Sequence, residues 1–197
     1  MLQERLSGYR IILASQSPRR QQLLHELGIK FDVVVNDFDE SYPSHLKKAE
    51  IAMYLANSKA NQLKMKLLDN EILITADTIV WCNGMVLGKP VNSEDSKRML
   101  REISGNVHEV ITGVSLFSTK KEKTFTDSTK VTFATLTDLE MDYYIKKFSP
   151  YDKAGAYGIQ EWIGLAACSR IEGSYFNVVG LPVQKLYREL QTFIYLH

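Results

Sequence analysis

The sequence predicts an α/β protein, and three observations support this prediction. Apolar, β-branched runs of strand length alternate with segments of helical periodicity along most of the chain. Residues 71–81 form a nearly continuous apolar run, typical of a central strand that is buried on both faces. Hydrophobic residues make up 45% of 197 residues, enough for a sizeable core. This length suits one domain, so residues 1–197 are predicted to form a single domain.

The first predicted unit is a buried strand at residues 11–14 followed by an amphipathic helix. Ser17 is a suitable N-cap, and Pro18 suits the first helical position. Gly28 suits the position just after the end of the helix. The chain therefore passes from a strand to a helix N-terminus at residues 15–20.

Polar and basic residues occupy this junction: Ser15, Ser17, Arg19 and Arg20. A helix N-terminus offers unpaired N–H groups and the positive end of a dipole. Arginine adds charge and bidentate donors suited to phosphate. The junction is therefore a candidate phosphate site, although an ordinary turn with two solvated arginines explains the same residues.

The remaining elements follow from periodicity and from turn residues. We expect, in order, a strand at 31–35, a helix at 49–68, the strand at 71–81, a hairpin turn at Asn83-Gly84 with a return strand at 85–87, a helix capped by Asn92 or Ser93 and stopped at Gly105, strands at 108–118 and 123–136, a helix at 138–148, a strand and loop at 152–162, and a C-terminal helix from Pro182 to about 193.

Composition excludes several classes of function. The formal net charge is +1, from 24 basic and 23 acidic residues, so wholesale binding to nucleic acid or to an anionic membrane is not expected. Cys82 and Cys168 are too few for a disulfide framework and are not spaced as a metal motif. No apolar run resembles a signal peptide or a membrane span, which predicts a cytoplasmic protein.

Two carboxylates are candidates for chemistry. Asp77 interrupts the central strand, where a carboxylate is costly unless it is paired, metal-bound or set in a cleft. A purely structural Asp77, satisfied by backbone or by an arginine, is the alternative. Glu40 follows the strand at 31–35 and is a candidate for binding metal or water, whereas nearby Asp37 fits a polar turn.

Three lysines and one glutamine add to this set. Lys59 falls on the apolar stripe of the helix at 49–68, so it either extends from the edge of that stripe or points into a cleft. Lys89 follows the return strand and is expected to come back near Asp77. Lys153 and Gln160 lie in a glycine-rich segment that a ligand could approach closely. His108, alone at the start of a strand, fits a structural role better than a catalytic one.

Together these residues indicate a polyphosphate ligand and a divalent metal. Positive side chains at strand ends and in loops of an α/β sheet tend to converge on one crevice. The sequence has no Walker A motif and no protein-kinase signature. It also has no Ser or Cys nucleophile placed with an evident His base. Direct attack of water on phosphorus is therefore expected, with metal and lysines neutralising charge.

Five segments also resemble the signature segments of the Maf-like nucleoside triphosphate pyrophosphatases. They are LASQSPRRQQLL, ADTIV, LGKP, KAGAYGIQ and GSYFNVVGLP, and they run from Leu13 to Pro182. The resemblance implies a fold like that of the inosine triphosphate pyrophosphatases, with a mixed twisted sheet flanked by helices and two lobes with a cleft between them. It also implies cleavage between the α and β phosphates with Mg²⁺ or Mn²⁺, and members of the family are cytoplasmic and often homodimeric.

The resemblance assigns roles residue by residue. Asp77 matches the proton acceptor of the family, and Glu40 and Asp77 would hold the metal. Positions associated with substrate choice are Arg19, Thr78 and Gln160. Lys59, Lys89 and Lys153 match cleft positions expected to bind phosphates. Ser15, Ser17 and Arg20 are expected to bind phosphates as part of the helix N-terminus described above.

The GAYGIQ form resembles the branch of the family that acts on dTTP and UTP. The amide of Gln160 can both donate and accept, so it can match O4 and N3–H of thymine or uracil. Glu161-Trp162 departs from the glycine usual after GIQ, and Ile103 replaces a usual leucine. The expected role is house-cleaning removal of dTTP, UTP or modified pyrimidine triphosphates. The alternatives are the same chemistry on 7-methyl-GTP and a non-catalytic nucleotide-binding regulator of cell division.

Overall fold

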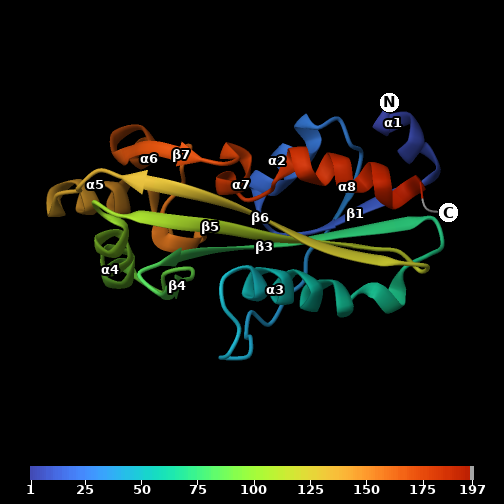
Figure 1. Ribbon diagram of the computed structural model, residues 1–197, viewed down its shortest axis with the longest axis horizontal. Coiled ribbons are helices and arrows are strands. Elements are labelled where there is room, and N and C mark those ends of the chain that lie inside the picture. The colour runs from blue at the N-terminus through green and yellow to red at the C-terminus, as the bar shows by residue number, and fades with distance from the viewer. Residues whose placement is uncertain (196–197) are drawn as a thin grey trace. The chain divides into compact units, whose positions relative to one another are not determined.

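A computed structural model describes residues 1–195 of the chain, and these divide into two compact units. Unit 1 comprises Met1–Asp77, Thr112–Asp127 and the residues described from Gly180 onward; unit 2 comprises Thr78–Ile111 and Ser128–Val179. The strands form a seven-stranded sheet in the order β2-β1-β3-β5-β6-β7, with β4 paired to β3 (Figure 1). Strands and helices alternate, which confirms the predicted mixed α/β class.

Three long strands contribute residues to both units, namely β3 (Glu71–Cys82), β5 (Val107–Phe117) and β6 (Glu122–Phe133). Unit 1 adds β1 (Arg10–Ala14), β2 (Asp32–Val34), α1 (Leu2–Arg5), α2 (Pro18–Glu26), α3 (Ala49–Asn61) and α8 (Val183–Tyr195), and the 3-10 helices η1 (Leu6–Gly8) and η2 (Lys64–Lys66). Unit 2 adds β4 (Met85–Leu87), β7 (Cys168–Glu172), α4 (Ser93–Ile103), α5 (Asp138–Phe148), α6 (Trp162–Ala167), α7 (Tyr175–Val179) and the 3-10 helix η3 (Ala154–Ala156).

In unit 1, parallel pairing surrounds a buried strand. β1 pairs in parallel with both β2 and β3, and its residues Ile11 to Ala14 are all buried. Helices α2 and α8 lie on one side of these strands and α3 lies on the other (Figure 1). Burial on both faces explains why β1 and β3 are continuous apolar runs and not alternating ones.

One glycine lets α3 approach the sheet closely. A Cβ atom on Gly113 of β5 would lie 2.1 Å from the carbonyl oxygen of Ala52 in α3. A side chain at this position would therefore push the helix away from the strand. The small buried residues Ala52 and Ala56 complete the contact face of the helix. This close packing sets how near the polar residues of α3 come to β3.

Unit 2 has its own core around the hairpin and the helices that follow it. β3 pairs antiparallel with β4, with Val80 opposite Leu87 and Cys82 opposite Met85. Asn83 and Gly84 between them have φ of 48° and 82°, as the predicted Asn-Gly turn requires. The largest buried side chains of this core include Tyr144 and Phe133.

Several predicted boundaries are confirmed. α2 starts at Pro18 with Ser17 as its N-cap, α4 is capped by Asn92, and α5 runs from Asp138 to Phe148. The C-terminal helix starts at Val183, next to the predicted Pro182. Local cap and turn chemistry was therefore a sound guide to where these elements begin and end.

Other predictions were wrong or incomplete. The helix predicted to reach residue 68 ends at Asn61, because the apolar stripe gives way to exposed residues in η2. The segment at 152–162, predicted as a strand and loop, contains no strand: it is a loop with η3 that leads into α6. Helices α6 and α7, strand β7 and helix α1 were not predicted. All four are six residues or shorter and have little periodicity to detect. The single domain over 1–197 stays a prediction.

Candidate active site

The centre of the candidate site arises from the way α3 meets β3. The hydroxyl of Thr75 in β3 donates a hydrogen bond of 2.6 Å to the carbonyl oxygen of Ala56 in α3. Asp77 lies two residues beyond Thr75 on the same face of the strand, and Lys59 lies about one helical turn beyond Ala56. The periods of strand and helix therefore bring the carboxylate and the ammonium together inside unit 1.

Lys59 binds two carboxylates. Its Nζ donates a short hydrogen bond to Asp77 Oδ1 and a second, of 3.2 Å, to Glu40 Oε1. The side chains of Lys59 and Asp77 are only 7% and 10% exposed, whereas that of Glu40 is 44% exposed. The ring of Phe38 also faces the ammonium, with its centroid 5.9 Å from Nζ. Lys59 thus points inward. The alternative, in which its side chain extends from the edge of the apolar stripe into solvent, is wrong.

This pairing explains how a carboxylate persists in a buried strand. Taking a carboxylate and an ammonium out of water costs several kcal/mol for each ion, and mutual attraction offsets this only with good geometry. The charges of Asp77 and Lys59 offset each other's desolvation cost directly. Glu40, in a more exposed loop, is the second carboxylate that contacts Lys59. The result is one nearly buried carboxylate and one accessible carboxylate facing a single cation.

The turn between β1 and α2 is held by its two serines. Ser15 Oγ accepts a hydrogen bond of 3.2 Å from the N–H of Ser17. Ser17 Oγ accepts one of 3.4 Å from the N–H of Arg20, as an N-cap should. Ser15 is buried and Arg19 lies partly exposed on the first turn of α2. Three of the predicted phosphate residues, Ser15, Ser17 and Arg20, thus lie at the N-terminus of α2.

Arg20 holds the backbone next to Asp77. Its Nε donates to the carbonyl of Gly180 at 2.8 Å, and Nη1 donates to the carbonyl of Ala76 at 2.9 Å. Burial lowers the pKa of Arg20 from its ordinary value, and the nearby charge of Asp77 opposes this shift. At least two of its N–H donors therefore bind backbone carbonyl groups. The sequence did not predict this role for Arg20.

Unit 2 contains the other four predicted residues, in four different settings. Thr78 is partly buried in β3 and Lys89 is exposed after β4, whereas Lys153 is buried and Gln160 is exposed in the loop around η3. The N–H of Gly155 donates to the carbonyl of Gly88 at 3.0 Å, which joins the two loops that carry the lysines.

Two residues that contact Lys153, and a third that contacts one of them, were not predicted to belong to the site. Lys153 Nζ lies 3.2 Å from Glu161 Oε1 and 2.7 Å from Asp152 Oδ1. Tyr144 donates a short hydrogen bond to Glu161 Oε2. Glu161 was noticed only as a departure from the family pattern. Tyr144 lies on an apolar helix face, and nothing in its spacing indicates where its hydroxyl points.

His108 and the cysteines have surroundings that fit structural roles. His108 is buried, and its Nε2 forms a 2.8 Å hydrogen bond with the hydroxyl of Tyr157. Burial lowers the pKa of His108 from 6.5 to about 4, so the ring is neutral at neutral pH. Cys82 and Cys168 are not bonded to each other, and burial raises the pKa of both thiols.

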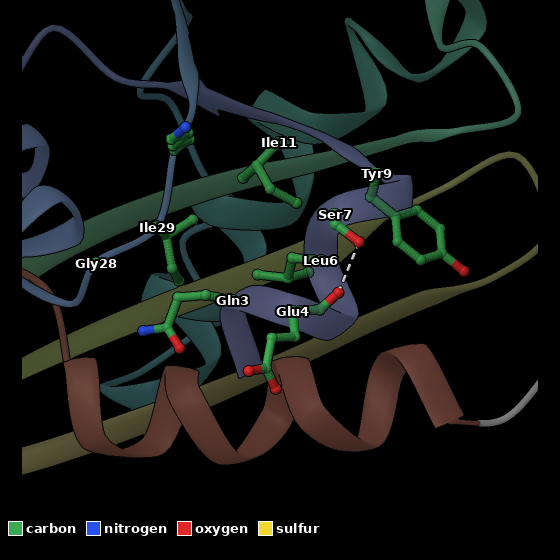
Figure 2. A pocket seen from close by; sticks show the side chains of 9 residues that line it. Gln3, Glu4, Leu6, Ser7, Tyr9, Ile11, Gly28 and Ile29 are labelled. Carbon is green, nitrogen blue, oxygen red and sulfur yellow. Dashed lines mark hydrogen bonds between the residues drawn. The ribbon is translucent and has the colours of Figure 1, made fainter. Parts of the chain in front are cut away.

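A separate cavity of about 510 Å³ lies near the N-terminus in unit 1 (Figure 2). Leu6, Ile11 and Ile29 contribute apolar side chains to it. Gln3 donates from Nε2 to the carbonyl of Leu27 at 3.1 Å, while its buried Oε1 has no hydrogen-bond partner. None of the predicted site residues lines this cavity.

Comparisons with known proteins identify the family of this chain. The family model described as "Maf-like protein" matches residues 10–193, so the chain belongs to the Maf-like family. A protein of Phocaeicola vulgatus called dTTP/UTP pyrophosphatase is 52% identical over 95% of this chain and 98% of its own. One of Flavobacterium johnsoniae with the same description is 50% identical over 98% of this chain and 100% of its own.

Among solved structures, the Ham1 protein of Staphylococcus aureus shares the fold. It has a TM-score of 0.53 at 14% identity, with 93% of this chain and 99% of that chain covered. The likeness supports the predicted inosine triphosphate pyrophosphatase-like fold class and says nothing of substrate. Among residues 1–195, no helix has both the length and the hydropathy to cross a membrane.

Proposed function

We propose that this protein is a nucleoside triphosphate pyrophosphatase that hydrolyses dTTP and UTP to the nucleoside monophosphate and pyrophosphate. The observation that carries the proposal is the nearly buried Asp77, paired with Lys59 on the central strand of a Maf-like fold. The relatives called dTTP/UTP pyrophosphatase support the choice of nucleotide. The protein would act in the cytoplasm as a homodimer, with no nucleic acid or membrane partner.

Asp77 is proposed as the general base. Its carboxylate takes a proton from a water molecule as the water oxygen attacks phosphorus and the bridging P–O bond between the α and β phosphates breaks. Pyrophosphate leaves and the nucleoside monophosphate gains the water oxygen. Lys59 lies close enough to Asp77 to steady the carboxylate, and its charge favours the phosphate anions. Ser15, Ser17, Arg20, Lys89 and Lys153 retain their predicted phosphate roles.

A divalent cation, Mg²⁺ or Mn²⁺, fits the donor set. Asp77 and Glu40 direct carboxylate oxygens to the same ammonium, so both lie within reach of one small volume. Magnesium is commonly held by one or two carboxylates together with substrate phosphates. Within residues 1–195, no three Asp, Glu, His or Cys side chains are grouped as a metal site. The bound cation would neutralise phosphate charge, and the substrate would supply its remaining oxygen ligands.

Gln160 is proposed to select the base, with Arg19 and Thr78. Its side chain is exposed, so the amide is accessible to a ligand. An amide can donate to O4 and accept from N3–H of uracil or thymine at the same time. A site built on such a pair rejects bases that leave its polar atoms unpaired. The preference for pyrimidines is therefore expected to depend on this side chain.

The test is a panel of triphosphates incubated with Mg²⁺ and scored for products. We expect dTTP and UTP to be hydrolysed fastest, with release of monophosphate and pyrophosphate. Fastest turnover of 7-methyl-GTP would replace the proposed substrate, and release of orthophosphate would contradict the proposed bond of cleavage. Tight nucleotide binding without turnover would favour the regulator instead.

A further inference from the structure

Lys153 is a buried lysine held by two carboxylates that differ in exposure. Its side chain is 9% exposed, while those of Glu161 and Asp152 are 19% and 56% exposed. A buried ammonium needs a partner that shares its low-dielectric surroundings, because attraction to a solvated charge is weakened by water. Glu161 is therefore the principal partner of Lys153, although the ammonium lies nearer to Asp152.

The second oxygen of Glu161 connects this pair to the backbone. Tyr144 donates to Glu161 Oε2, and the same tyrosine oxygen accepts a 2.9 Å hydrogen bond from the N–H of Gly158. Tyr144 is buried, and burial raises the pKa of Tyr144 above its ordinary value of 10. The hydroxyl is thus protonated at neutral pH, and a continuous chain of contacts joins Lys153, Glu161, Tyr144 and Gly158.

This chain of contacts closes around the loop that carries Gln160. The N–H of Glu161 donates to the carbonyl of Gly158 at 3.0 Å, and the carbonyl of Glu161 accepts from the N–H of Gly164 at 3.0 Å. A Cβ atom on Gly158 would lie only 2.8 Å from the carboxyl carbon of Glu161, so the carboxylate packs directly against this glycine. The backbone beside Gln160 is fixed, while the amide itself stays exposed.

We propose that Glu161 is a positioning residue, which orients Lys153 and, through Tyr144, the Gln160 loop for recognition of a pyrimidine triphosphate. This inference rests on the proposed function and adds a residue to it. Glu161 itself does not contact the substrate in this account. It determines where one phosphate-binding cation and one base-reading amide lie.

Three variants test the proposal by two measurements: KM for dTTP, and the ratio of kcat/KM for dTTP to kcat/KM for GTP. E161Q removes the negative charge that faces Lys153, but it keeps an oxygen that can accept a hydrogen bond from Tyr144. Y144F removes the connection to Gly158 but leaves Lys153 and Glu161 paired. D152N, the matched control, removes one negative charge from the same lysine without a bond to Tyr144 among those described for residues 1–195.

We expect E161Q to lower kcat/KM for dTTP about tenfold, mainly through KM, because a displaced cation weakens phosphate binding. We expect Y144F to reduce the dTTP to GTP ratio about tenfold with a smaller change in KM, because the base-reading amide is misplaced. D152N should leave the ratio within about twofold of the parent, since a solvated partner contributes little.

An unchanged ratio in folded Y144F, or an unchanged KM in folded E161Q, would overturn the proposal. If thermal unfolding shows that E161Q does not fold, Y144F decides alone. If D152N shifts the ratio as much as Y144F, the effect belongs to the charge of Lys153, and the positioning role is overturned. Failure of the parent protein to hydrolyse dTTP would overturn the proposed function, so the two failures are distinguishable.

Discussion

Two buried lysines, one in each unit, face two carboxylates each, yet their surroundings differ. In unit 1, Lys59 faces Asp77 and Glu40, and Asp77 accepts a hydrogen bond from this ammonium. In unit 2, Lys153 faces Asp152 and Glu161, and Glu161 also accepts from Tyr144. The first arrangement leaves a carboxylate that can exchange partners during a reaction. The second fixes its carboxylate from both sides.

This difference shows that similar ion pairs can have different roles. One can hold a catalytic carboxylate, and another can hold neighbouring groups in position. A general base must accept a proton and release it, so its contacts should be few and polar. A positioning group should change as little as possible, so a network of satisfied contacts suits it. Variants in the two clusters should accordingly have different signatures, with loss of turnover in unit 1 and altered recognition in unit 2.

The largest expected effect is on stability. K59M should lower the free energy of unfolding by about 3–5 kcal/mol, because it leaves Asp77 buried without its cation. K153M should cost roughly half as much, because Glu161 keeps the Tyr144 hydroxyl and Asp152 is solvated. Urea unfolding of both variants measures the difference.

The double variant K59M/D77N is the control for this prediction. It removes both charges, so it should recover a large part of the stability lost in K59M. A loss for K153M that equals or exceeds the loss for K59M would contradict the claim that unit 1 holds the less supported carboxylate.

A second prediction concerns acid pH and singles out unit 2. The pKa of His108 is lowered by burial to about 4, while an unfolded histidine has a pKa near 6.5. The unfolded state therefore binds more protons between these values, so the His108 contribution is complete above pH 6.5 and is lost as the pH falls towards 4. The free energy of unfolding should decrease by about 3 kcal/mol over this range.

H108Q should remove most of this acid sensitivity, and H25Q should not. His25 is exposed at the end of α2, so its exchange for glutamine is a matched control. Urea unfolding of the parent and both variants at pH 7 and pH 4.5 measures the effect. Equal acid sensitivity in the parent and in H108Q would show that other groups dominate.

The smallest expected effect concerns the metal. E40Q should raise the Mg²⁺ concentration for half-maximal activity about tenfold, because it removes one of two carboxylates near the cation. Turnover at saturating Mg²⁺ should fall only slightly, because Asp77 remains. E50Q is a matched control on α3, since Glu50 is exposed and is not a predicted ligand. If E50Q raises the Mg²⁺ concentration for half-maximal activity as much as E40Q does, the effect comes from the loss of negative charge in general and not from a lost ligand.

Much of the fold was predictable because its signals are local. Ser17, Asn92 and the Asn83-Gly84 turn mark element boundaries by their own chemistry. A long apolar run in the sequence predicts the central strand. The short elements α6, β7 and α7 were missed because their five or six residues depend on packing against the rest of unit 2.

The site was predictable only in part, for a related reason. Lys59 and Asp77 each stood out because a charged residue interrupts an apolar pattern, and the structure pairs them. The direction of the Arg20 side chain and the contact between Tyr144 and Glu161 depend on rotamers and on distant segments. Sequence spacing carries no information on either, so these roles became visible only in three dimensions.

The most direct test of the account compares D77N with D37N in single-turnover hydrolysis of dTTP. Asp37 is an exposed aspartate of the same unit and controls for the loss of one charge. D77N is expected to lose turnover by about 10²-fold or more while its Kd for a non-hydrolysable dTTP analogue stays within about threefold of the parent. D37N is expected to behave like the parent. Unchanged turnover in folded D77N would contradict the claim that the carboxylate of the central strand is the catalytic base.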